Sequence, residues 1–284
     1  MKKLISALVL CIFMYSCSSV PITGRSQLSL VSDQDVLSLS LQQYNDYMSS
    51  APVSKDKANT DLVVKVGKNI AAAVATYYEA AGISSMLSGY SWEFNLIADS
   101  QVNAFCMPGG KIVVYEGILP YTQTETGLAV VLGHEVAHAI AKHANERMSQ
   151  QMVADYGTAA IGSLFSKSSA AVQTIGNTVL GLGTQYGVML PFSRKQELEA
   201  DRLGLVFMAI AGYDPNQALP FWERMSQQGS SVPEFMSTHP SDATRIADIK
   251  KDLPEALSYY QAVKGGSSNT TTPSNVKTSD QWKF

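Results

Sequence analysis

The stretch of sequence that decides the fold is Leu132-Gly133-His134-Glu135-Val136-Ala137-His138. Histidines four residues apart lie only about 40° apart around a helix of 3.6 residues per turn, so both imidazoles can reach one metal ion. Glu135 can project towards a water molecule at that metal, where a carboxylate would take the proton as the water attacks a carbonyl. With four histidines in the chain, a chance match is expected in well under about one such chain in a hundred. The motif therefore predicts a catalytic zinc site on a buried helix.

A catalytic zinc usually keeps three protein ligands and one open position, so a third ligand is required. The metzincin spacing would place a histidine six residues after His138, but Ala144 occupies that position. On a continuous helix His143 lies about 140° from His138. We therefore expect His143 to be a structural or supporting histidine rather than a ligand.

The best candidate for the third ligand is Glu197. On a helix Glu197 and Asp201 share one face, so Glu197 can bind zinc while Asp201 accepts a hydrogen bond from a ligand histidine and fixes its tautomer. Glu199 is expected to point elsewhere. A solvated charged helix face is the alternative, but Leu198 and Leu203 indicate that this segment is not wholly exposed.

The composition is that of a folded globular protein, because 45% of the residues are hydrophobic and only 16% are charged. The net charge is -3, and Lys and Arg form no concentrated block. The chain therefore has no general electrostatic reason to bind nucleic acid, and no nucleic-acid partner is expected.

The first residues predict export. Met1-Lys2-Lys3 is a cationic start, and the apolar run 4–15 has the length expected for a signal peptide and is too short to span a bilayer comfortably. A small residue, Ser16, precedes Cys17, which resembles a bacterial lipoprotein cleavage box. We expect a signal peptide over 1–16, lipidation of Cys17 and a lipidated tether over 17–31. The alternative is a plain signal peptide followed by a chance cysteine.

Once the signal is removed, Cys17 and Cys106 are the remaining cysteines. If Cys17 carries lipid, Cys106 has no partner within the chain for a disulfide. Cys106 could act as a nucleophile, but no neighbouring base is implied. We therefore interpret it as a small apolar residue of a strand.

Apolar spacing predicts a mainly helical α+β fold, in which short apolar runs divided by Gly and Pro form a small sheet. Helices are expected over 32–50, 61–81, 124–152, 193–211, 218–228 and 243–253, and strands over 92–96 and 111–115. For 153–189 we expect two close-packed helices or a mobile flap rather than a membrane hairpin, because polar residues interrupt every run of about 20 residues. One domain over 32–263 and a disordered tail over 264–284 are predicted.

The combination of His134-Glu135-x-x-His138 with Glu197-x-x-x-Asp201 resembles the zinc metallopeptidases of the CAAX prenyl protease type, including their HtpX-like and BepA-like bacterial members. The resemblance covers about 32–253. It implies a mainly helical gluzincin fold, with His134, His138 and Glu197 as zinc ligands and Glu135 as general base. It also implies proteolysis of misfolded or misassembled envelope proteins.

Two further stretches resemble parts of the cleft in that family. Asn103-Ala104-Phe105 resembles the start of the edge strand above the zinc, where backbone groups can pair with an extended substrate. His239, with Pro240 and Arg245, resembles a segment near the cleft, and as a candidate catalytic residue it could stabilise the oxyanion or occupy the open zinc position. A surface-loop histidine is an equal alternative.

The chain lacks the membrane spans of HtpX-like proteins and the helical repeats of BepA-like ones, so we expect a short lipoprotein form of the family. The expected function is a membrane-anchored zinc metalloendopeptidase of protein quality control, acting on unfolded or misassembled proteins. The expected location is the envelope of a Gram-negative bacterium, facing the periplasm, with the outer membrane favoured. The alternatives are an envelope chaperone or assembly factor with latent protease activity, and a structural zinc protein, which would leave Glu135 without a task.

Overall fold

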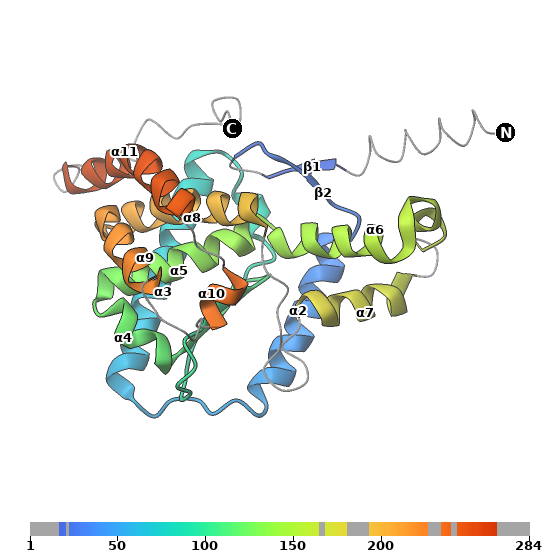
Figure 1. The fold of residues 1–284 in the computed structure, drawn as a ribbon, viewed down its shortest axis with the longest axis horizontal. Coiled ribbons are helices and arrows are strands. Elements are labelled where there is room, and N and C mark those ends of the chain that lie inside the picture. The colour runs from blue at the N-terminus through green and yellow to red at the C-terminus, as the bar shows by residue number, and fades with distance from the viewer. Residues whose placement is uncertain are drawn as a thin grey trace.

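The structure, a computed structural model, describes residues 17–20, 23–164, 168–180, 193–226, 234–239 and 243–265. It is mainly helical with one three-stranded sheet, which confirms the expected fold class (Figure 1). The helices are α2 (Asp33–Met48), α3 (Lys57–Ala80), α4 (Leu119–Thr122), α5 (Glu125–Ile140), α6 (His143–Leu164), α7 (Ser168–Val179), α8 (Arg194–Ile210), α9 (Ala218–Ser226), α10 (Glu234–Thr238) and α11 (Ala243–Gly265), with short 3₁₀ turns η1 (Ser84–Leu87), η2 (Glu116–Ile118) and η3 (Pro215–Gln217). The strands are β1 (Cys17–Ser19), β2 (Ser26–Leu28), β3 (Glu93–Ile97), β4 (Ala104–Met107) and β5 (Lys111–Tyr115).

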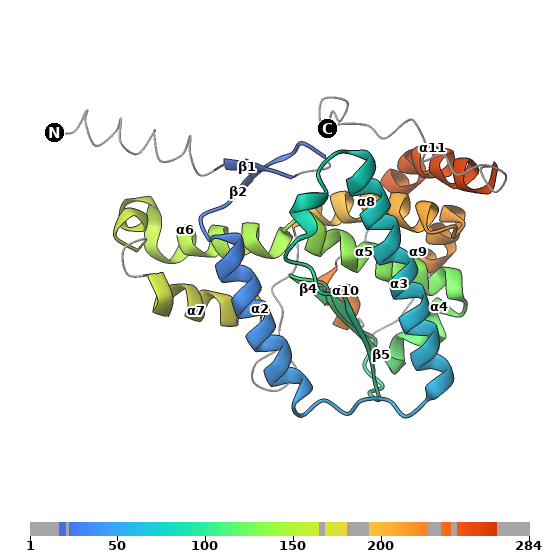
Figure 2. The same ribbon diagram turned by 180° about the vertical axis from the view of Figure 1, so that it is seen from behind.

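Helix α5 carries the histidine motif and lies in the middle of the helical body (Figures 1 and 2). Every residue from Gly127 to Ile140 is buried, as its continuous apolar sequence requires. Helices α3 and α8 and strand β4 all pack against it. Thr124 caps its first turn by accepting a hydrogen bond from the backbone N–H of Gly127. The motif is therefore held in the core rather than on the surface.

Helices α5 and α8 approach closely at two glycines. A Cβ atom on Gly133 would lie 2.8 Å from the carbonyl oxygen of Gly204, and one on Gly204 would lie 2.8 Å from the backbone nitrogen of His134. Only glycine permits this separation of the two helix backbones. The close approach brings the polar side chains of α8 against the motif histidines.

The sheet has the order β3-β5-β4, with β3 parallel and β4 antiparallel to β5, so β4 is an edge strand of the described sheet. The carbonyl of Asn103 accepts from the N–H of Tyr115, and that of Met107 accepts from the N–H of Gly110. Backbone groups alternate in direction along an antiparallel strand. Those of Phe105 therefore face β5, and those of Ala104 and Cys106 face the open edge.

The helix expected over 124–152 is in fact two helices. Helix α5 ends at Ile140 and α6 begins at His143, because Lys142 between them has a φ of 57°, in the left-handed region. His143 therefore does not continue the spiral of α5, and the expected angle of 140° from His138 is wrong. Helix α7 packs on α6, while 165–167 and 181–192 lie outside the described residues.

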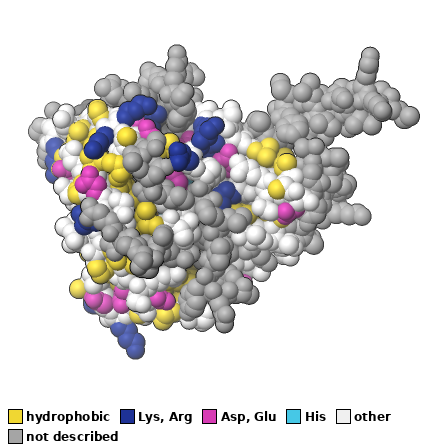
Figure 3. All heavy atoms as spheres, in the orientation of Figure 1, with side chains coloured by type: hydrophobic (Ala, Val, Ile, Leu, Met, Phe, Trp, Pro, Cys, Tyr) yellow, Lys and Arg dark blue, Asp and Glu magenta, His cyan; other side chains and the backbone are white. Residues whose placement is uncertain are grey.

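The surface agrees with the small net charge of the chain. Figure 3 shows positive and negative side chains interspersed on the face that it draws. None of the helices in the described part of the chain combines the length and the apolar character needed to cross a bilayer.

The described residues of the segment 17–31, for which the sequence predicted a lipidated tether, pack onto the domain. Strands β1 and β2 form an antiparallel pair, and Val20, Leu30 and Val31 are buried. Thr23 is also buried, and Arg25 is half-buried. The segment is therefore structurally part of the domain. The predicted signal peptide over 1–16 lies outside the described residues.

Helix α11 is longer than expected. It continues through Pro254 to Gly265 instead of ending near Leu253, because Ala256 and Tyr259 stay buried in the core. Proline removes one backbone donor, and packing of these side chains holds the helix beyond it. Nothing after Gly265 is among the described residues.

Candidate metal centre

Four buried side chains converge on one point. His134 and His138 come from α5, Glu197 from α8, and His239 from the position after α10. One ligand atom of each lies within 4.8 Å of the others. Nε2 of His134 is 3.0 Å from Nε2 of His138 and 3.1 Å from Nδ1 of His239, and Oε1 of Glu197 is 3.3 Å from Nε2 of His138. The structure thus brings together the three predicted ligands and His239.

The hydrogen bonds around these rings leave acceptor atoms facing one another. Nδ1 of His134 donates to Oδ1 of Asp201 at 2.9 Å, so in the neutral ring Nε2 carries the lone pair. Nδ1 of His138 lies 2.8 Å from His143, which leaves the Nε2 lone pair of His138 facing the cluster. Two imidazole lone pairs and a carboxylate repel one another unless a cation lies between them.

The spacing of the donors fits zinc. Tetrahedral zinc with bonds of about 2.1 Å requires ligand atoms roughly 3.4 Å apart. Nε2 of His138 is 3.0 Å from Nε2 of His134 and 3.3 Å from Oε1 of Glu197, and Nε2 of His134 is 3.5 Å from the other oxygen of Glu197, Oε2. Two histidines and a glutamate are also a donor set found at catalytic zinc sites.

Carboxylates give the cluster a negative potential. Burial alone would lower the pKa of His134, but hydrogen bonds and charges from Asp201 and Glu197 raise it to about 9. Burial would raise the pKa of Glu197, yet the charges of His239 and Arg245 hold it well below its usual value. A site that retains a proton so strongly also attracts a metal cation.

Arg245 belongs to this site, although the sequence assigned it no role. Its Nε donates to Oδ2 of Asp201 at 2.6 Å, its Nη2 donates to Oδ1 at 2.8 Å, and its Nη1 lies 2.9 Å from Oε2 of Glu197. The guanidinium is buried and lies 3.7 Å from the centre of the Trp222 ring. Arg245 therefore fixes both carboxylates, and the indication of this from sequence was its place in the stretch that resembles a segment near the cleft.

Glu135 lies beside the cluster with one oxygen open. Within the described residues Oε1 of Glu135 has no hydrogen-bond donor, although Nε2 of His239 is 3.4 Å away. Burial raises the pKa of Glu135 despite a backbone hydrogen bond from Cys106 of β4. A buried carboxylate with a raised pKa and an open oxygen is suited to take up a proton.

His143 is not one of the four converging side chains but touches one of them. Its Nδ1 lies 2.8 Å from Nδ1 of His138, and its Nε2 lies 2.9 Å from Oε2 of Glu199. Burial lowers the pKa of His143, which favours the neutral ring. Glu199, expected to point elsewhere, faces His143 rather than the metal cluster.

The edge strand β4 lies next to Glu135 but differs from the expectation in its register. Of the three candidate substrate-binding residues, Ala104 has backbone groups that face the open edge, and Asn103 accepts a hydrogen bond from Ala104 through its side chain at 2.9 Å. Phe105 instead turns its backbone towards β5 and packs its ring against Tyr47. Cys106 replaces Phe105 as the second residue whose backbone groups point to the open edge, and its N–H donates to Glu135.

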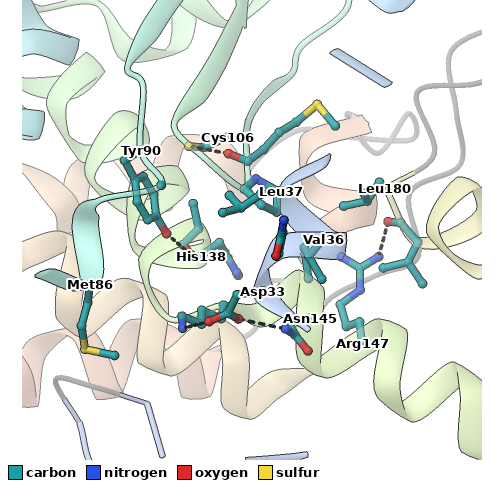
Figure 4. A pocket seen from close by; sticks show the side chains of 18 of the residues that line it. Asp33, Val36, Leu37, Met86, Tyr90, Cys106, His138, Asn145, Arg147 and Leu180 are labelled. Atoms are coloured by element: carbon teal, nitrogen blue, oxygen red, sulfur yellow. Dashed lines mark hydrogen bonds and ion pairs between the residues drawn. The ribbon is translucent and has the colours of Figure 1, made fainter. Parts of the chain in front are cut away.

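A cavity of about 360 Å³ opens beside His138 (Figure 4). Its walls are mostly apolar and include Leu37 of α2, Met86 of η1, Tyr90 and Cys106. Burial raises the pKa of the Cys106 thiol well above its usual value, so the side chain stays a neutral thiol. The cavity therefore offers an apolar space between the edge strand and a candidate metal ligand.

The chain is similar to known metalloendopeptidases and to a protease. The mitochondrial metalloendopeptidase OMA1 of Schizosaccharomyces pombe is 43% identical over 176 residues, which cover 61% of this chain and 50% of that protein. The human metalloendopeptidase OMA1 is 28% identical over 248 residues, covering 84% of this chain and 46% of that protein. The beta-barrel assembly-enhancing protease of Escherichia coli is 28% identical over 247 residues, covering 84% and 48%. The chain spans about half the length of these curated relatives.

The family itself follows from a match over most of the chain. The description of peptidase family M48 matches residues 67–253, which contain all four converging side chains. Zinc is the cofactor of that family, and the donor set here fits it. The chain belongs to peptidase family M48.

Proposed function

We propose that this chain is a zinc metalloendopeptidase, with His134, His138 and Glu197 as metal ligands and Glu135 as general base. The observation that carries the proposal is the open Oε1 of Glu135. This oxygen is buried beside the acceptor atoms of the histidine and glutamate cluster, whose mutual repulsion a bound cation would remove. A structural zinc site would have no use for such a base. The relatives whose names include metalloendopeptidase or protease support the same activity.

Each residue has a separate task in peptide hydrolysis. When bound, zinc acts as a Lewis acid and lowers the pKa of a water molecule at the site. Glu135 takes the proton from the attacking water and passes it to the leaving nitrogen. Asp201 keeps the ring hydrogen of His134 on Nδ1, and Arg245 holds Asp201 in place.

The substrate is proposed to bind as an extended chain along the open edge of β4. The backbone of Cys106 hydrogen-bonds Glu135, so a peptide paired with this strand would lie next to the base. The apolar cavity beside His138 is placed to receive an apolar side chain close to the scissile bond. Unfolded and misassembled proteins expose such side chains along extended segments, which makes them the favoured substrates.

The cellular setting is proposed from the first residues and from one relative. The start of the chain supports removal of 1–16 and lipidation of Cys17. The proposed domain of 32–263 is extended to the packed segment from Cys17 and to Gly265 at the end of α11, and composition supports a disordered tail after it. The Escherichia coli relative is named as a beta-barrel assembly-enhancing protease, whereas the OMA1 relatives are named as mitochondrial. We favour a short, lipid-anchored member of the CAAX prenyl protease type, facing the periplasm from the outer membrane and acting in protein quality control.

The position of His239 supports a second candidate function, an envelope chaperone or assembly factor with latent protease activity. Its Nδ1 lies 3.1 Å from Nε2 of His134 and 3.0 Å from Oε1 of Glu197. With His239 as a fourth ligand, no position would stay open for water or substrate. The chain would then hold unfolded proteins and cut them only after His239 leaves.

Glu135→Gln tests the proposed function. Zinc content of the purified chain should stay near one ion per molecule, while cleavage of a denatured, fluorescently labelled protein should fall by roughly 10²- to 10⁴-fold. Glu79→Gln, at an exposed position on α3, is the matched control and should change neither. Cleavage by Glu135→Gln at the wild-type rate would show that the mechanism is wrong. Sequencing of the wild-type products should reveal apolar residues next to the cut sites.

A further inference from the structure

The ring of His138 turns its second nitrogen away from the metal cluster and towards a second buried polar network. Nδ1 of His138 lies 2.8 Å from Nδ1 of His143, and Nε2 of His143 lies 2.9 Å from Oε2 of Glu199. His143 and Glu199 are 0% and 1% exposed, so no bulk water competes for these bonds. The contact therefore couples a candidate metal ligand to a carboxylate that does not touch the cluster.

One placement of the ring hydrogens allows both hydrogen bonds in the series His138, His143 and Glu199. Nε2 of His138 faces Glu197 and the candidate metal position, so the hydrogen of this ring is on Nδ1 and donates to Nδ1 of His143. The hydrogen of His143 is then on Nε2 and donates to Glu199. A partner that fixes the tautomer and angle of a ligand histidine also raises its metal affinity.

Glu199 is itself held by the segment that connects β1 to β2. Thr23 donates from its hydroxyl to Oε1 of Glu199, and Arg25 donates from Nε to Oε2 at 2.7 Å. The other end of the Arg25 fork binds both oxygens of Glu146, at 2.9 and 2.8 Å. Gln196 also donates to Glu146, at 2.8 Å. These hydrogen bonds and ion pairs thus hold the segment that contains Thr23 and Arg25 against α6 and α8.

We propose that Thr23 and Arg25 are positioning residues for the metal centre, because they hold Glu199, which holds His143, which orients His138 towards zinc. The inference rests on the proposed zinc enzyme. It makes the segment that follows the candidate lipid-anchor residue Cys17 a structural part of the active site. By linkage, zinc binding should in turn stabilise the packing of this segment.

Zinc affinity of the full chain, measured by competition with a chromogenic chelator, tests the proposal. Arg25→Gln should weaken zinc binding by roughly tenfold, the lower end of the effect of losing a partner that orients a ligand. The matched control is Arg202→Gln. Arg202 also forms a partly buried Arg–Glu pair, 2.9 Å from Glu255, and its side chain is 17% exposed against 15% for Arg25. The control should keep wild-type zinc affinity within about twofold, since its pair does not touch a ligand histidine.

A purely structural role would give a different result. Arg25→Gln and Arg202→Gln would then lower the melting temperature to a similar extent and leave zinc affinity unchanged, which would overturn the inference. The absorption spectrum of the cobalt-substituted chain adds a readout of ligand geometry. It should change in Arg25→Gln and stay as in wild type in Arg202→Gln.

Two further variants keep the test decisive if Arg25→Gln does not fold. Thr23→Val removes one bond to Glu199 at nearly constant shape, and Arg25→Lys keeps the charge but cannot fork between Glu199 and Glu146. Both should weaken zinc binding by roughly threefold, and wild-type affinity in both would refute the inference. If the wild-type chain binds no zinc, the proposed function fails; if it binds zinc and these variants match it, the inference alone fails.

Discussion

The two ring nitrogens of His138 face two buried networks built from the same kinds of side chain. On the Nε2 side, His138, His134 and Glu197 direct acceptor atoms at one another, His239 lies beside them, and Glu135 keeps an open oxygen. On the Nδ1 side, His143 and Glu199 pass hydrogen bonds along a line that ends at Arg25. His143 and Glu199 are as deeply buried as the metal cluster, whereas Arg25 is half-buried. The two networks differ in how hydrogen-bond donors and acceptors are matched. Acceptors face acceptors in the candidate metal site, whereas each donor faces an acceptor in the structural network.

Helix α8 supplies side chains to both networks, and it does so from two different faces. Glu197 faces the metal cluster, whereas Gln196 and Glu199 face the second network. The pKa of Glu199 is lowered although burial would raise it, because His143, Thr23 and Arg25 stabilise its charge. A short stretch of one helix thus supplies both a metal ligand and the support for another ligand.

The largest effect should come from Glu197→Gln compared with Glu199→Gln. Removing a ligand should weaken zinc binding more than about 100-fold, whereas removing the carboxylate that supports a ligand should cost about 10- to 100-fold at most. Metal analysis after dialysis, together with chelator competition, measures both. Equal zinc affinities in the two variants would contradict the assignment of Glu197 as a ligand and of Glu199 as a support for one.

A smaller effect is expected for His239→Ala. If His239 fills the fourth position for most of the time, its removal should raise the rate of proteolysis by roughly three- to tenfold, because the competent fraction rises. Cleavage of a denatured labelled protein measures this, with zinc content as the control. A fall in rate would instead assign His239 to the oxyanion, and an unchanged rate would leave it a bystander.

The smallest effect concerns a carboxylate outside both networks. Asp252 on α11 has its pKa raised from 3.8 to about 6, chiefly by burial and also by Glu255, although Arg202 opposes this. Because the folded-state pKa is raised, protonated Asp252 favours folding at low pH, and this contribution is lost as the pH rises through about 6.

Asp252→Asn should therefore stabilise the chain by about 1 kcal/mol at pH 7.5, a value reduced for partial exposure, and by almost nothing at pH 4. Urea unfolding at the two pH values measures the difference. A destabilised variant at pH 7.5 would show that the ionised carboxylate is well stabilised, as it is in the two networks.

The parts of the site that follow from local geometry were predictable from sequence. The helical period places His134 and His138 together, and the same period places Glu197 and Asp201 on one face. The contact of His143 with His138 was not predictable, because it depends on the break at Lys142. The ion pair of Arg25 with Glu199 joins residues 174 positions apart, and no local pattern indicates it.

The sheet shows the same limit. The strands over 92–96 and 111–115 were close to the observed β3 and β5, because alternation and turn residues are local signals. Which backbone groups of β4 face outwards depends on its register with β5. Because of that register, the backbone of Cys106, rather than that of the predicted Phe105, points to the open edge next to Glu135.

The most direct test of the metal centre is an anomalous difference map recorded at the zinc absorption edge from crystals of the full chain. We predict one peak about 2.0 to 2.2 Å from Nε2 of His134, Nε2 of His138 and a carboxylate oxygen of Glu197. A zinc-replete crystal with no peak at this point, or with zinc bound without Glu197, would contradict this prediction.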